Sequence, residues 1–352
     1  MKIGNGIKIS NNYIKLNFFT SILLLLSFIG CSSLIQRNLY SLAGTTMGTT
    51  YSLKVIEPEN SKKLIKLDKK IDSVLVDVNN KMSTYIPTSE LSLFNQSTST
   101  DWLKISGDLA QVINTSKRIS NESNGSFDIT VGPLVNLWGF GPTKKDSLIP
   151  NQKMIDETLQ NVGMDKMIID FEGMRIKKNN PNIYCDLSAI AKGFGVDKVG
   201  LFLERIGLNE YMIEIGGEVR TKGKNKNNEN WKIGISAPAT NGLQKVLEIS
   251  NYAVATSGDY FNYFEENGIR FSHTIDPKTG KPITHKLASV TVVYKDCENA
   301  DAYATAIDVL GPEAGYNFAM KMKLPVFMIV RENNEFIEKM TPQFEEFIRK
   351  EN

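Results

Sequence analysis

The sequence of 352 residues has few of the side chains from which several kinds of site are built. It contains only three cysteines and two histidines, which excludes a disulfide-stabilised scaffold and a Cys/His zinc site of ordinary spacing. Its 41 basic and 39 acidic residues give a formal net charge of +2, too small for a field that holds a nucleic-acid backbone. With 41% hydrophobic residues, the chain has material for one large core or two modest ones.

The N-terminal segment lacks acidic residues, since none occurs before Glu57. Three lysines precede the apolar run Ile22–Ile29, which is much shorter than the about 20 residues of a membrane-spanning helix. The run ends in Gly30 and Cys31. This pattern resembles a bacterial lipoprotein signal, although Phe28 stands where a leucine is usual, and an uncleaved anchor or a plain signal peptide are the alternatives.

This interpretation predicts a signal over residues 1–30, an acylated Cys31 and a polar tether over residues 31–40. Cleavage leaves 38 basic and 39 acidic residues, because the signal contains three lysines and no acid. The mature protein is therefore expected to be almost neutral and lipid-anchored on the outer (periplasmic) side of the bacterial cytoplasmic membrane, within the cell envelope.

Hydrophobic periodicity predicts the regular elements. The expected strands are Tyr51–Val55, Met167–Phe171, Met174–Lys178, Tyr211–Ile215, Trp231–Ile235, Ala288–Tyr294 and Val326–Val330. The expected helices are Leu64–Met82, Asp108–Ser123, Ala189–Ile206 and Asn299–Leu310. Several strand pairs have the form of hairpins, so we predict an α+β fold with mixed sheets and interleaved helices. Residues 41–340 are expected to form a single large unit, followed by a short amphipathic tail over residues 341–352.

Five segments interrupt the periodicity with clustered Gly, Asp, Thr or His: Gly44–Tyr51, Asn124–Leu134, Cys185–Gly195, Phe271–Gly280 and Ala300–Ala306. The first is expected to be a small-residue loop entering a strand, where the backbone can approach a ligand, or else a structural turn. The second sets the Asp128 carboxylate between an aromatic residue and a Gly-Pro turn, an arrangement that ordinary packing also produces.

The third segment is predicted to run from a strand through a polar turn into a helix. Free N–H groups and Lys192 at such a helix start are suited to a phosphate. The segment matches neither the P-loop pattern nor the dinucleotide pattern GxGxxG. In the alternative, Asp186 or Ser188 caps the helix and Lys192 lies on the surface.

The fourth segment carries His273 directly before an Asp-Pro-x-Thr-Gly turn. A chain with two histidines offers few proton acceptors near neutral pH, so His273 is the candidate general base, with a structural role as the alternative. His285 has no comparable setting.

In the fifth segment, Asp301 and Thr305 lie one helical turn apart, so their oxygen atoms point the same way. A carboxylate and a hydroxyl among small alanines suit Mg²⁺, which keeps water and bridges phosphate oxygens. The same spacing is common on exposed helices.

Taken in order, the motifs resemble the FAD:protein FMN transferase family, the ApbE-type lipoproteins. The matching motifs are Met47–Tyr51, Ser83–Tyr85, Gly125–Asp128, Val131–Leu134, Asp186–Gly193, Glu214–Glu218, Ser257–Tyr260, His273–Pro277 and Ala300-Asp301 with Thr305. The resemblance implies an ApbE-like, T-fold-related architecture. It also implies an enzyme that attaches FMN from FAD to a Thr or Ser hydroxyl of another protein and releases AMP.

The resemblance further implies the roles of individual residues. Contacts with FAD are expected from Met47, Tyr85, Ser126, Phe127, Asp128, Asp186, Lys192 and Ile275. Mg²⁺ is expected on Asp301, Thr305 and the backbone carbonyl of Ala189. The expected acceptors are flavin-carrying subunits of sodium-pumping NADH:quinone reductases or related electron-transfer complexes. Two other functions stay open at this point: an FAD pyrophosphatase that gives FMN and AMP, and a lipid-anchored flavin-binding module without catalysis.

Overall fold

The computed structural model describes residues 37–142, 149–237, 243–258, 263–266, 269–333 and 335–349. The described residues from Asn38 onward form one compact unit. The expected signal over residues 1–30 and the acylated Cys31 lie outside the described residues. Within the described ranges, no helix is both long enough and apolar enough to span a bilayer.

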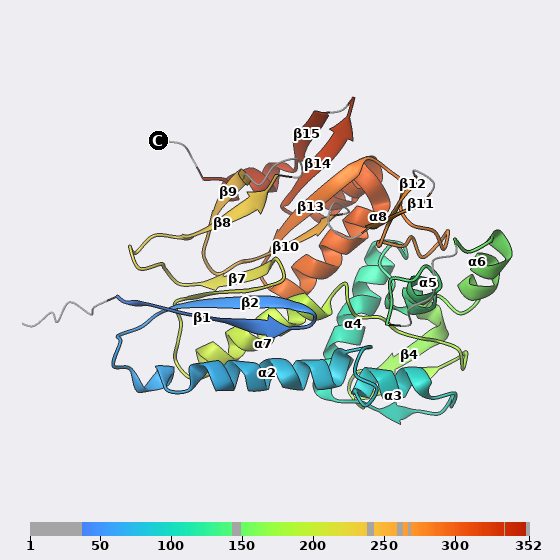
Figure 1. Ribbon diagram of the computed structural model, residues 1–352, viewed down its shortest axis with the longest axis horizontal. Coiled ribbons are helices and arrows are strands. Elements are labelled where there is room, and N and C mark those ends of the chain that lie inside the picture. Colours follow the sequence, from blue (N-terminus) through green and yellow to red (C-terminus); the bar gives the residue numbers. More distant parts are fainter. Residues whose placement is uncertain are drawn as a thin grey trace, which may run out of the picture. The chain divides into compact units, whose positions relative to one another are not determined.

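An antiparallel sheet of eight strands runs through this unit (Figure 1). In spatial order its strands are β1 (Leu39–Thr46), β2 (Thr49–Ile56), β6 (Tyr211–Ile215), β7 (Glu218–Lys222), β10 (Ala253–Gly258), β13 (Leu287–Tyr294), β14 (Val326–Glu332) and β15 (Glu335–Met340). Smaller sheets pair β3 (Leu103–Lys104) and β4 (Met167–Asp170) with β5 (Arg175–Lys178), β8 (Trp231–Ser236) with β9 (Leu243–Ile249), and β11 (Tyr263–Glu266) with β12 (Ile269–Ser272). These sheets confirm the predicted α+β class.

The helices are interleaved with these strands. The α-helices are α2 (Leu67–Met82), α3 (Glu90–Gln96), α4 (Gly107–Glu122), α5 (Gly132–Leu137), α6 (Gln152–Leu159), α7 (Ala191–Arg205) and α8 (Cys297–Met322). The 3-10 turns are η1 (Lys62–Leu64), η2 (Ile129–Val131), η3 (Met164–Lys166) and η4 (Pro342–Phe347). Helices α7 and α8 pack together against the middle strands of the large sheet, as Figure 1 shows.

The burial of strand β13 shows that both faces of the large sheet are covered. Every residue from Leu287 to Val293 is buried, which fits the continuous apolar run of its sequence. Val290 belongs to the core cluster that includes α8, whereas Val293 belongs to the cluster that includes the β8–β9 pair. The second cluster also takes in Phe344 of η4, whose ring stacks on Phe327 at 5.5 Å. The expected amphipathic tail therefore helps to cover one face of the sheet.

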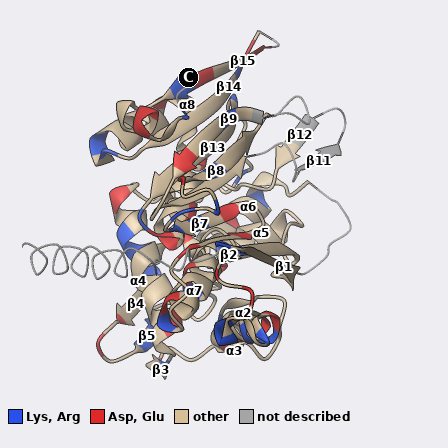
Figure 2. Ribbon diagram, turned by 90° about the vertical axis from the view of Figure 1, so that its left-hand side faces the viewer, with Lys and Arg blue, Asp and Glu red and all other residues tan. Residues whose placement is uncertain are grey.

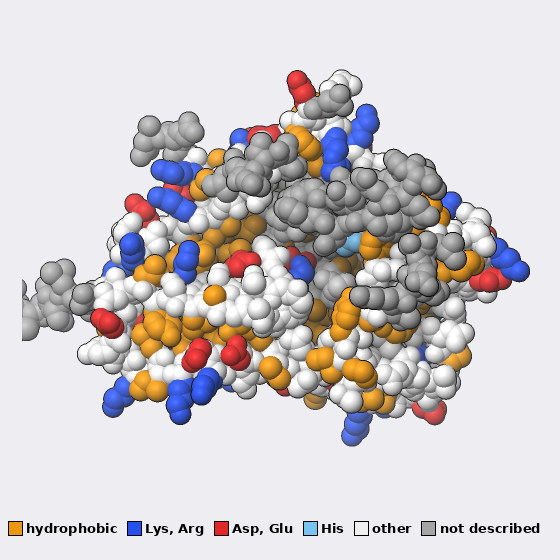
Figure 3. Space-filling model, viewed as in Figure 1, with side chains coloured by type: hydrophobic (Ala, Val, Ile, Leu, Met, Phe, Trp, Pro, Cys, Tyr) orange, Lys and Arg blue, Asp and Glu red, His pale blue; other side chains and the backbone are white. Residues whose placement is uncertain are grey.

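The first two strands form a hairpin, which confirms the structural turn that was the alternative for Gly44–Tyr51 and corrects the expected loop. Thr46 pairs with Thr49, and the turn residues Met47 and Gly48 have φ of 51° and 72°, as in a two-residue hairpin turn. Gly44 lies opposite Tyr51, and a Cβ on Gly44 would lie 2.6 Å from the Tyr51 ring. The small residue is therefore needed to admit a cross-strand aromatic ring. Hydrophobic side chains gather between this hairpin and α2 (Figure 3).

Acidic and basic residues are interspersed along the described chain (Figure 2), so opposite charges lie close enough to pair. Asp108 of α4 illustrates this, since its two carboxylate oxygens accept from Lys81 of α2 and Lys198 of α7, each at 2.9 Å. Such a pair network ties together three helices that are far apart in sequence.

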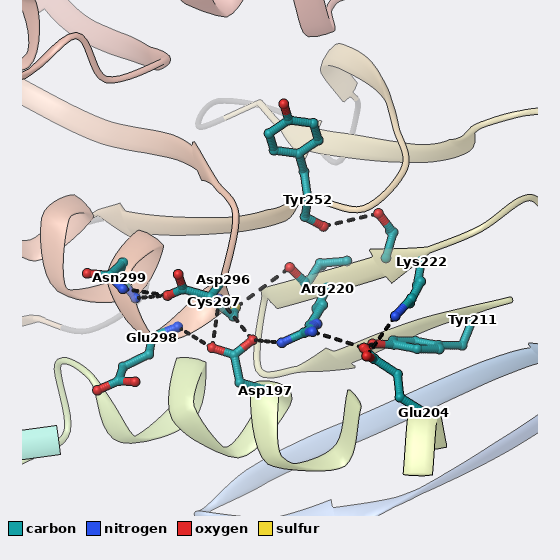
Figure 4. Close-up of polar contacts among 12 residues, drawn as sticks. Asp197, Glu204, Tyr211, Arg220, Lys222, Tyr252, Asp296, Cys297, Glu298 and Asn299 are labelled. Atoms are coloured by element: carbon teal, nitrogen blue, oxygen red, sulfur yellow. Dashed lines mark hydrogen bonds and ion pairs between the residues drawn. The ribbon is translucent and has the colours of Figure 1, made fainter. Parts of the chain in front are cut away.

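A buried ionic network fixes the start of α8 (Figure 4). The Asp197 carboxylate of α7 accepts hydrogen bonds from the backbone N–H groups of Cys297, at 2.9 and 3.0 Å, and Glu298, at 2.8 Å. These groups belong to the first turn of α8, whose N–H groups have no partner within their own helix. Arg220 of β7 donates to the same carboxylate at 2.7 Å.

The network continues from Arg220 to the C-terminal end of α7. Glu204 accepts from Arg220 at 3.0 Å, from Lys222 at 2.7 Å and from the Tyr211 hydroxyl at 2.8 Å (Figure 4). The two helices and two strands of the large sheet are thereby held by one set of charged groups.

We expect Asp197→Ala to lower the free energy of unfolding by about 3–5 kcal/mol, because it removes one of the two carboxylates that bind the Arg220 guanidinium and leaves two buried N–H groups of α8 without their acceptor. Urea unfolding measures this loss. The control is Asp170→Ala, which removes a carboxylate at the same 2.7 Å from an arginine, Arg175, but on an exposed turn. Its loss should be much smaller. Equal losses in the two variants would contradict the anchoring role of Asp197.

The buried carboxyl group of Glu298 makes the free energy of unfolding depend on pH. Its carboxylate is 3% exposed, and burial raises its pKa from the ordinary 4.5 to about 7 against the opposing hydrogen bond from Gln111. Between these two pH values the folded chain binds more protons than the unfolded chain, so the free energy of unfolding falls as pH rises.

We therefore expect Glu298→Gln to be as stable as the wild type at pH 4.5 and more stable at pH 8, by on the order of 3 kcal/mol. Urea unfolding of both proteins at the two pH values measures the difference, and the contributions of all other groups cancel in the comparison. The same pH dependence in both proteins would show that Glu298 does not titrate in this window.

Candidate active site

The candidate site forms where α7 and α8 cross. A Cβ on Gly193 would lie 2.3 Å from the Cys297 carbonyl oxygen and 2.8 Å from the Asp301 Cβ, so only glycine permits this approach. At this contact the Gly193 N–H donates to Asp301 Oδ2 at 2.9 Å. The carboxylate of α8 thus binds the first turn of α7, where free N–H groups and the helix dipole favour negative charge.

Lys192 and Glu218 complete a charged cluster beside Asp301. The Lys192 Nζ lies 2.5 Å from Glu218 Oε1, which brings together the start of α7 and the start of β7. Lys192 is half-buried, and its ammonium is paired with a buried carboxylate instead of being free on the surface. Glu218 is 1% exposed, and its Oε2 atom has no hydrogen-bond partner within the described chain.

The electrostatics of this cluster favour an added cation. Burial raises the pKa of the Glu218 carboxyl, and Asp301 raises it further against the effect of Lys192. Burial alone would lower the pKa of Lys192, but Asp301 and Glu218 raise it by more, so the ammonium keeps its proton. Burial also raises the pKa of Asp301. Two carboxylates and one ammonium leave an excess negative charge when all three are ionised.

The residues expected to hold Mg²⁺ lie around the same crossing. Asp301 and Thr305 are one turn apart in α8, and Ala189 is half-buried in the turn that enters α7. The described residues contain no group of three His, Cys, Asp or Glu side chains able to hold a metal. One buried carboxylate, one hydroxyl and one carbonyl instead fit Mg²⁺, which binds proteins through one or two carboxylates and takes its other ligands from phosphate and water.

Asp186 and Tyr85 lie at a second part of the candidate site. Asp186 Oδ1 accepts from the Ser188 N–H at 2.8 Å, so its side chain shapes the turn before α7. It does not cap α7, whose N-cap is Ile190 without a side-chain bond, and the capping alternative is wrong. The Tyr85 ring is 69% exposed, and burial of part of it together with the Asp186 charge raises the Tyr85 pKa. An exposed ring beside a carboxylate is accessible to a flat ligand.

The segment Ser126–Asp128 is engaged within the fold. The Phe127 ring is 2% exposed and packs in the main core cluster, and Ser126 is also buried. Asp128 accepts from the backbone N–H and the hydroxyl of Thr130 at 2.7 and 2.6 Å and from the Met164 N–H at 3.1 Å. The FAD contacts expected of these three residues stay predictions, and of Tyr85 and Phe127 only Tyr85 has an accessible ring.

Two further residues that are expected to contact FAD, Met47 and Ile275, lie in separate parts of the fold. Met47, at the tip of the β1–β2 hairpin, has its Cε 2.8 Å from the position of a Cβ on Gly195, so it lies over α7. Ile275 is 5% exposed and belongs to a separate apolar cluster with Leu134 and Trp138.

His273 lies beside that apolar cluster. Its ring is half-buried and meets the Phe140 ring edge-on, with centroids 6.4 Å apart. The turn that follows is stabilised by Asp276, which accepts from the Lys278 N–H at 2.9 Å and the Thr279 hydroxyl at 3.0 Å. The Trp138 indole donates to the Gly280 carbonyl at 2.8 Å and so attaches this turn to the aromatic cluster.

Sequence reasoning assigned no role to Glu218, Asp197 or Asp308. Glu218 was noted only as the end of a Gly-Gly motif, and its partner Lys192 is distant in sequence. The two consecutive glycines, Gly216 and Gly217, with φ of 60° and 105°, were the available signal that a strand turns back at this point.

Comparison with known proteins identifies relatives over nearly the whole described chain. The model of the ApbE family matches residues 47–328, a range that includes every candidate site residue from Met47 to Thr305. A Vibrio cholerae protein named FAD:protein FMN transferase is 41% identical over 336 residues, which cover 95% of this chain and 99% of that protein. A Haemophilus influenzae protein of the same name is 44% identical over 326 residues, covering 91% and 94%.

Solved structures give the same result. The flavin transferase ApbE from Vibrio cholerae superposes with a TM-score of 0.83 at 40% identity, covering 88% of this chain and 99% of that one. The apo form of the Pseudomonas stutzeri flavinyl transferase ApbE also gives a TM-score of 0.83, at 35% identity, covering 90% and 98%.

We expect Gly193→Ala to lower the free energy of unfolding by about 1–3 kcal/mol, because the added methyl meets backbone atoms of α8 that cannot move independently. Urea unfolding measures it. The matched control is Gly195→Ala in the same helix, where the added methyl meets the flexible end of Met47 at 2.8 Å. The control should lose less or gain stability, since alanine favours helix. Equal losses would show that the helix crossing does not depend on Gly193.

Proposed function

This chain belongs to the ApbE family, and from that membership we propose that it transfers FMN from FAD to a Thr or Ser hydroxyl of an acceptor protein. The observation that carries the proposal is the buried Asp301 carboxylate at the first turn of α7, with Lys192 and Glu218 beside it. Transfer of a phosphoryl group depends mainly on positioning and on neutralisation of charge. The buried carboxylates of this cluster would hold the cation that neutralises the phosphates.

The proposed reaction replaces the phosphoanhydride bond of FAD with a phosphoester bond to the acceptor, without oxidation or reduction. The acceptor hydroxyl oxygen bonds to the flavin-side phosphorus of FAD, the bond from that phosphorus to the bridging oxygen breaks, and AMP leaves with the electron pair. The proton of the hydroxyl passes to a ring nitrogen of His273, which acts as general base. The start of α7 presents the positive end of its helix dipole to the diphosphate, and Lys192 adds positive charge there. The Ala191, Gly193 and Phe194 N–H groups are already bound within the protein.

The residues present fit Mg²⁺. Asp301, Thr305 and the Ala189 carbonyl would hold the ion, and the second buried carboxyl of the cluster, Glu218, with its orphaned oxygen supports a cation there. When bound, Mg²⁺ supplies positive charge that stabilises the phosphate oxygens.

The remaining contacts belong to the flavin and adenine ends of FAD. Tyr85 offers an exposed ring for stacking, and Met47, Asp186 and Ile275 are proposed neighbours of the same substrate. Ser126, Phe127 and Asp128, which are engaged within the fold, are proposed to act through their backbone and by shaping the wall.

We further propose that the protein works in the cell envelope, anchored by a lipid on Cys31 to the outer side of the cytoplasmic membrane. The lysine-rich start, the apolar run and the Gly-Cys step support this. The proposed acceptors are flavin-carrying subunits of electron-transfer complexes such as sodium-pumping NADH:quinone reductases.

We expect Asp301→Asn to lower the rate of transfer by about 10²–10³-fold, because an amide binds the cation that would neutralise the phosphates much more weakly than a carboxylate does. Its stability should change little, since the amide oxygen still accepts from the Gly193 N–H. The assay incubates the protein with FAD, Mg²⁺ and an acceptor domain and measures flavin fluorescence of the acceptor on a denaturing gel.

The matched control is Asp296→Asn, at the N-cap of the same helix, where asparagine caps as well as aspartate. It should label at the wild-type rate. Release of FMN and AMP without a label on the acceptor would indicate a pyrophosphatase, and FAD binding without release of AMP would indicate a binding module. If Asp301→Asn does not fold, the carboxylate of Asp301 is needed for the fold, and the lost activity would not show a role in the reaction.

A further inference from the structure

The segment that carries His273 is attached to α8 through Asp308. The Thr274 hydroxyl donates to Asp308 Oδ2 at 3.2 Å, and both side chains are buried. Further along the segment, the His285 ring bonds through Nε2 to the Asp308 backbone carbonyl at 2.7 Å. The side chain and the main chain of Asp308 therefore hold the two ends of the segment 274–285.

The carbonyl of Asp308 is available because α8 is interrupted just beyond it. Gly311 has φ of 78° and ψ of −177°, so the regular helix ends at Leu310 and resumes at Pro312. Carbonyls in the last turn of a helix lack an intrahelical partner, and His285 supplies one. A Cβ on Gly311 would lie 2.8 Å from the His285 ring, so glycine at the break also makes room for that ring.

Asp308 lies on the same face of α8 as the proposed Mg²⁺ ligands. Asp301, Thr305 and Asp308 follow the spacing i, i+4 and i+7, which places them along one stripe of a helix. Asp301 and Asp308 are about 10 Å apart along the axis at 1.5 Å per residue. Asp308, which binds Thr274, and Asp301, which belongs to the charged cluster, therefore lie at the two ends of one face of α8.

We propose that Asp308 is a positioning residue, which sets the place of His273 relative to Asp301 by holding the adjacent Thr274. This inference rests on the proposed transfer function, in which His273 accepts the proton of the acceptor hydroxyl. The backbone of residue 274 is also bound, since the Ile283 N–H donates to the Thr274 carbonyl at 3.0 Å. The hydroxyl of Thr274 adds the bond that joins this part of the segment to α8.

The test removes the hydroxyl and keeps the shape. Thr274→Val retains the branched side chain but cannot donate to Asp308, whereas Thr274→Ser retains the donor. We expect Thr274→Val to lower the kcat of transfer by about 10–100-fold with the KM for FAD within about twofold, because a small misplacement of a catalytic group affects the reaction more than binding. Thr274→Ser should stay within about threefold of the wild type in both constants.

Two measurements separate positioning from damage to the fold. The amount of FAD bound per chain is determined in the same samples, so that a smaller folded fraction is not mistaken for a lower kcat. If Thr274→Val melts below the assay temperature, the test uses Thr274→Ala instead. Alanine also lacks the hydroxyl donor and adds no methyl group in its place, and the expected result is the same.

Equal losses in the valine and serine variants, a raised KM with unchanged kcat, or wild-type kinetics in Thr274→Val would each overturn the positioning role. Failure of the wild-type protein to label the acceptor is a different result, since it would overturn the proposed function itself and the inference with it.

Discussion

Helices α7 and α8 cap each other across their crossing, and the candidate site depends on this exchange. Asp301 of α8 accepts from the Gly193 N–H in the first turn of α7, and Asp197 of α7 accepts from the Cys297 and Glu298 N–H groups in the first turn of α8. Each carboxylate thus satisfies N–H groups that neither helix can satisfy alone. Because both contacts are buried, neither helix can shift without leaving a carboxylate or several N–H groups unpaired.

The two capping carboxylates, Asp197 and Asp301, have surroundings of different charge. Asp197 lies against Arg220, which continues into a network with Glu204 and Lys222, so its charge is balanced within the fold. Asp301 instead shares Lys192 with a second buried carboxylate, Glu218. A cluster that is left with excess negative charge is costly to bury on its own, whereas a bound cation would lower that cost. The balanced carboxylate, Asp197, stabilises the fold, whereas Asp301 is the proposed ligand of a cation.

Periodicity was enough to predict elements whose faces differ in burial. It located β6 at both of its ends, α4 to within one residue at each end, and the alternating strand β8. It missed β1, because an edge strand with half-exposed side chains and a glycine opposite Tyr51 carries little hydrophobic signal. The motifs placed Lys192 and Asp301 in the site, but their meeting at the helix crossing, and the part taken by Glu218, depend on contacts between distant segments. Such contacts follow from the fold and not from local pattern.

The two histidines show how the structure decides between residues of one type. The Leu287 N–H donates to His285 Nδ1 at 3.3 Å, so that nitrogen is an acceptor and the ring proton lies on Nε2, which donates to the Asp308 carbonyl. With both nitrogens bound to backbone groups, His285 cannot take a proton from a substrate without breaking the cap at the end of the first part of α8. The proposed general base is instead His273, whose ring borders the aromatic cluster and whose neighbour Thr274 is bound to the same Asp308. His285 thus attaches the segment 274–285 to α8, and the position of His273 depends on that attachment.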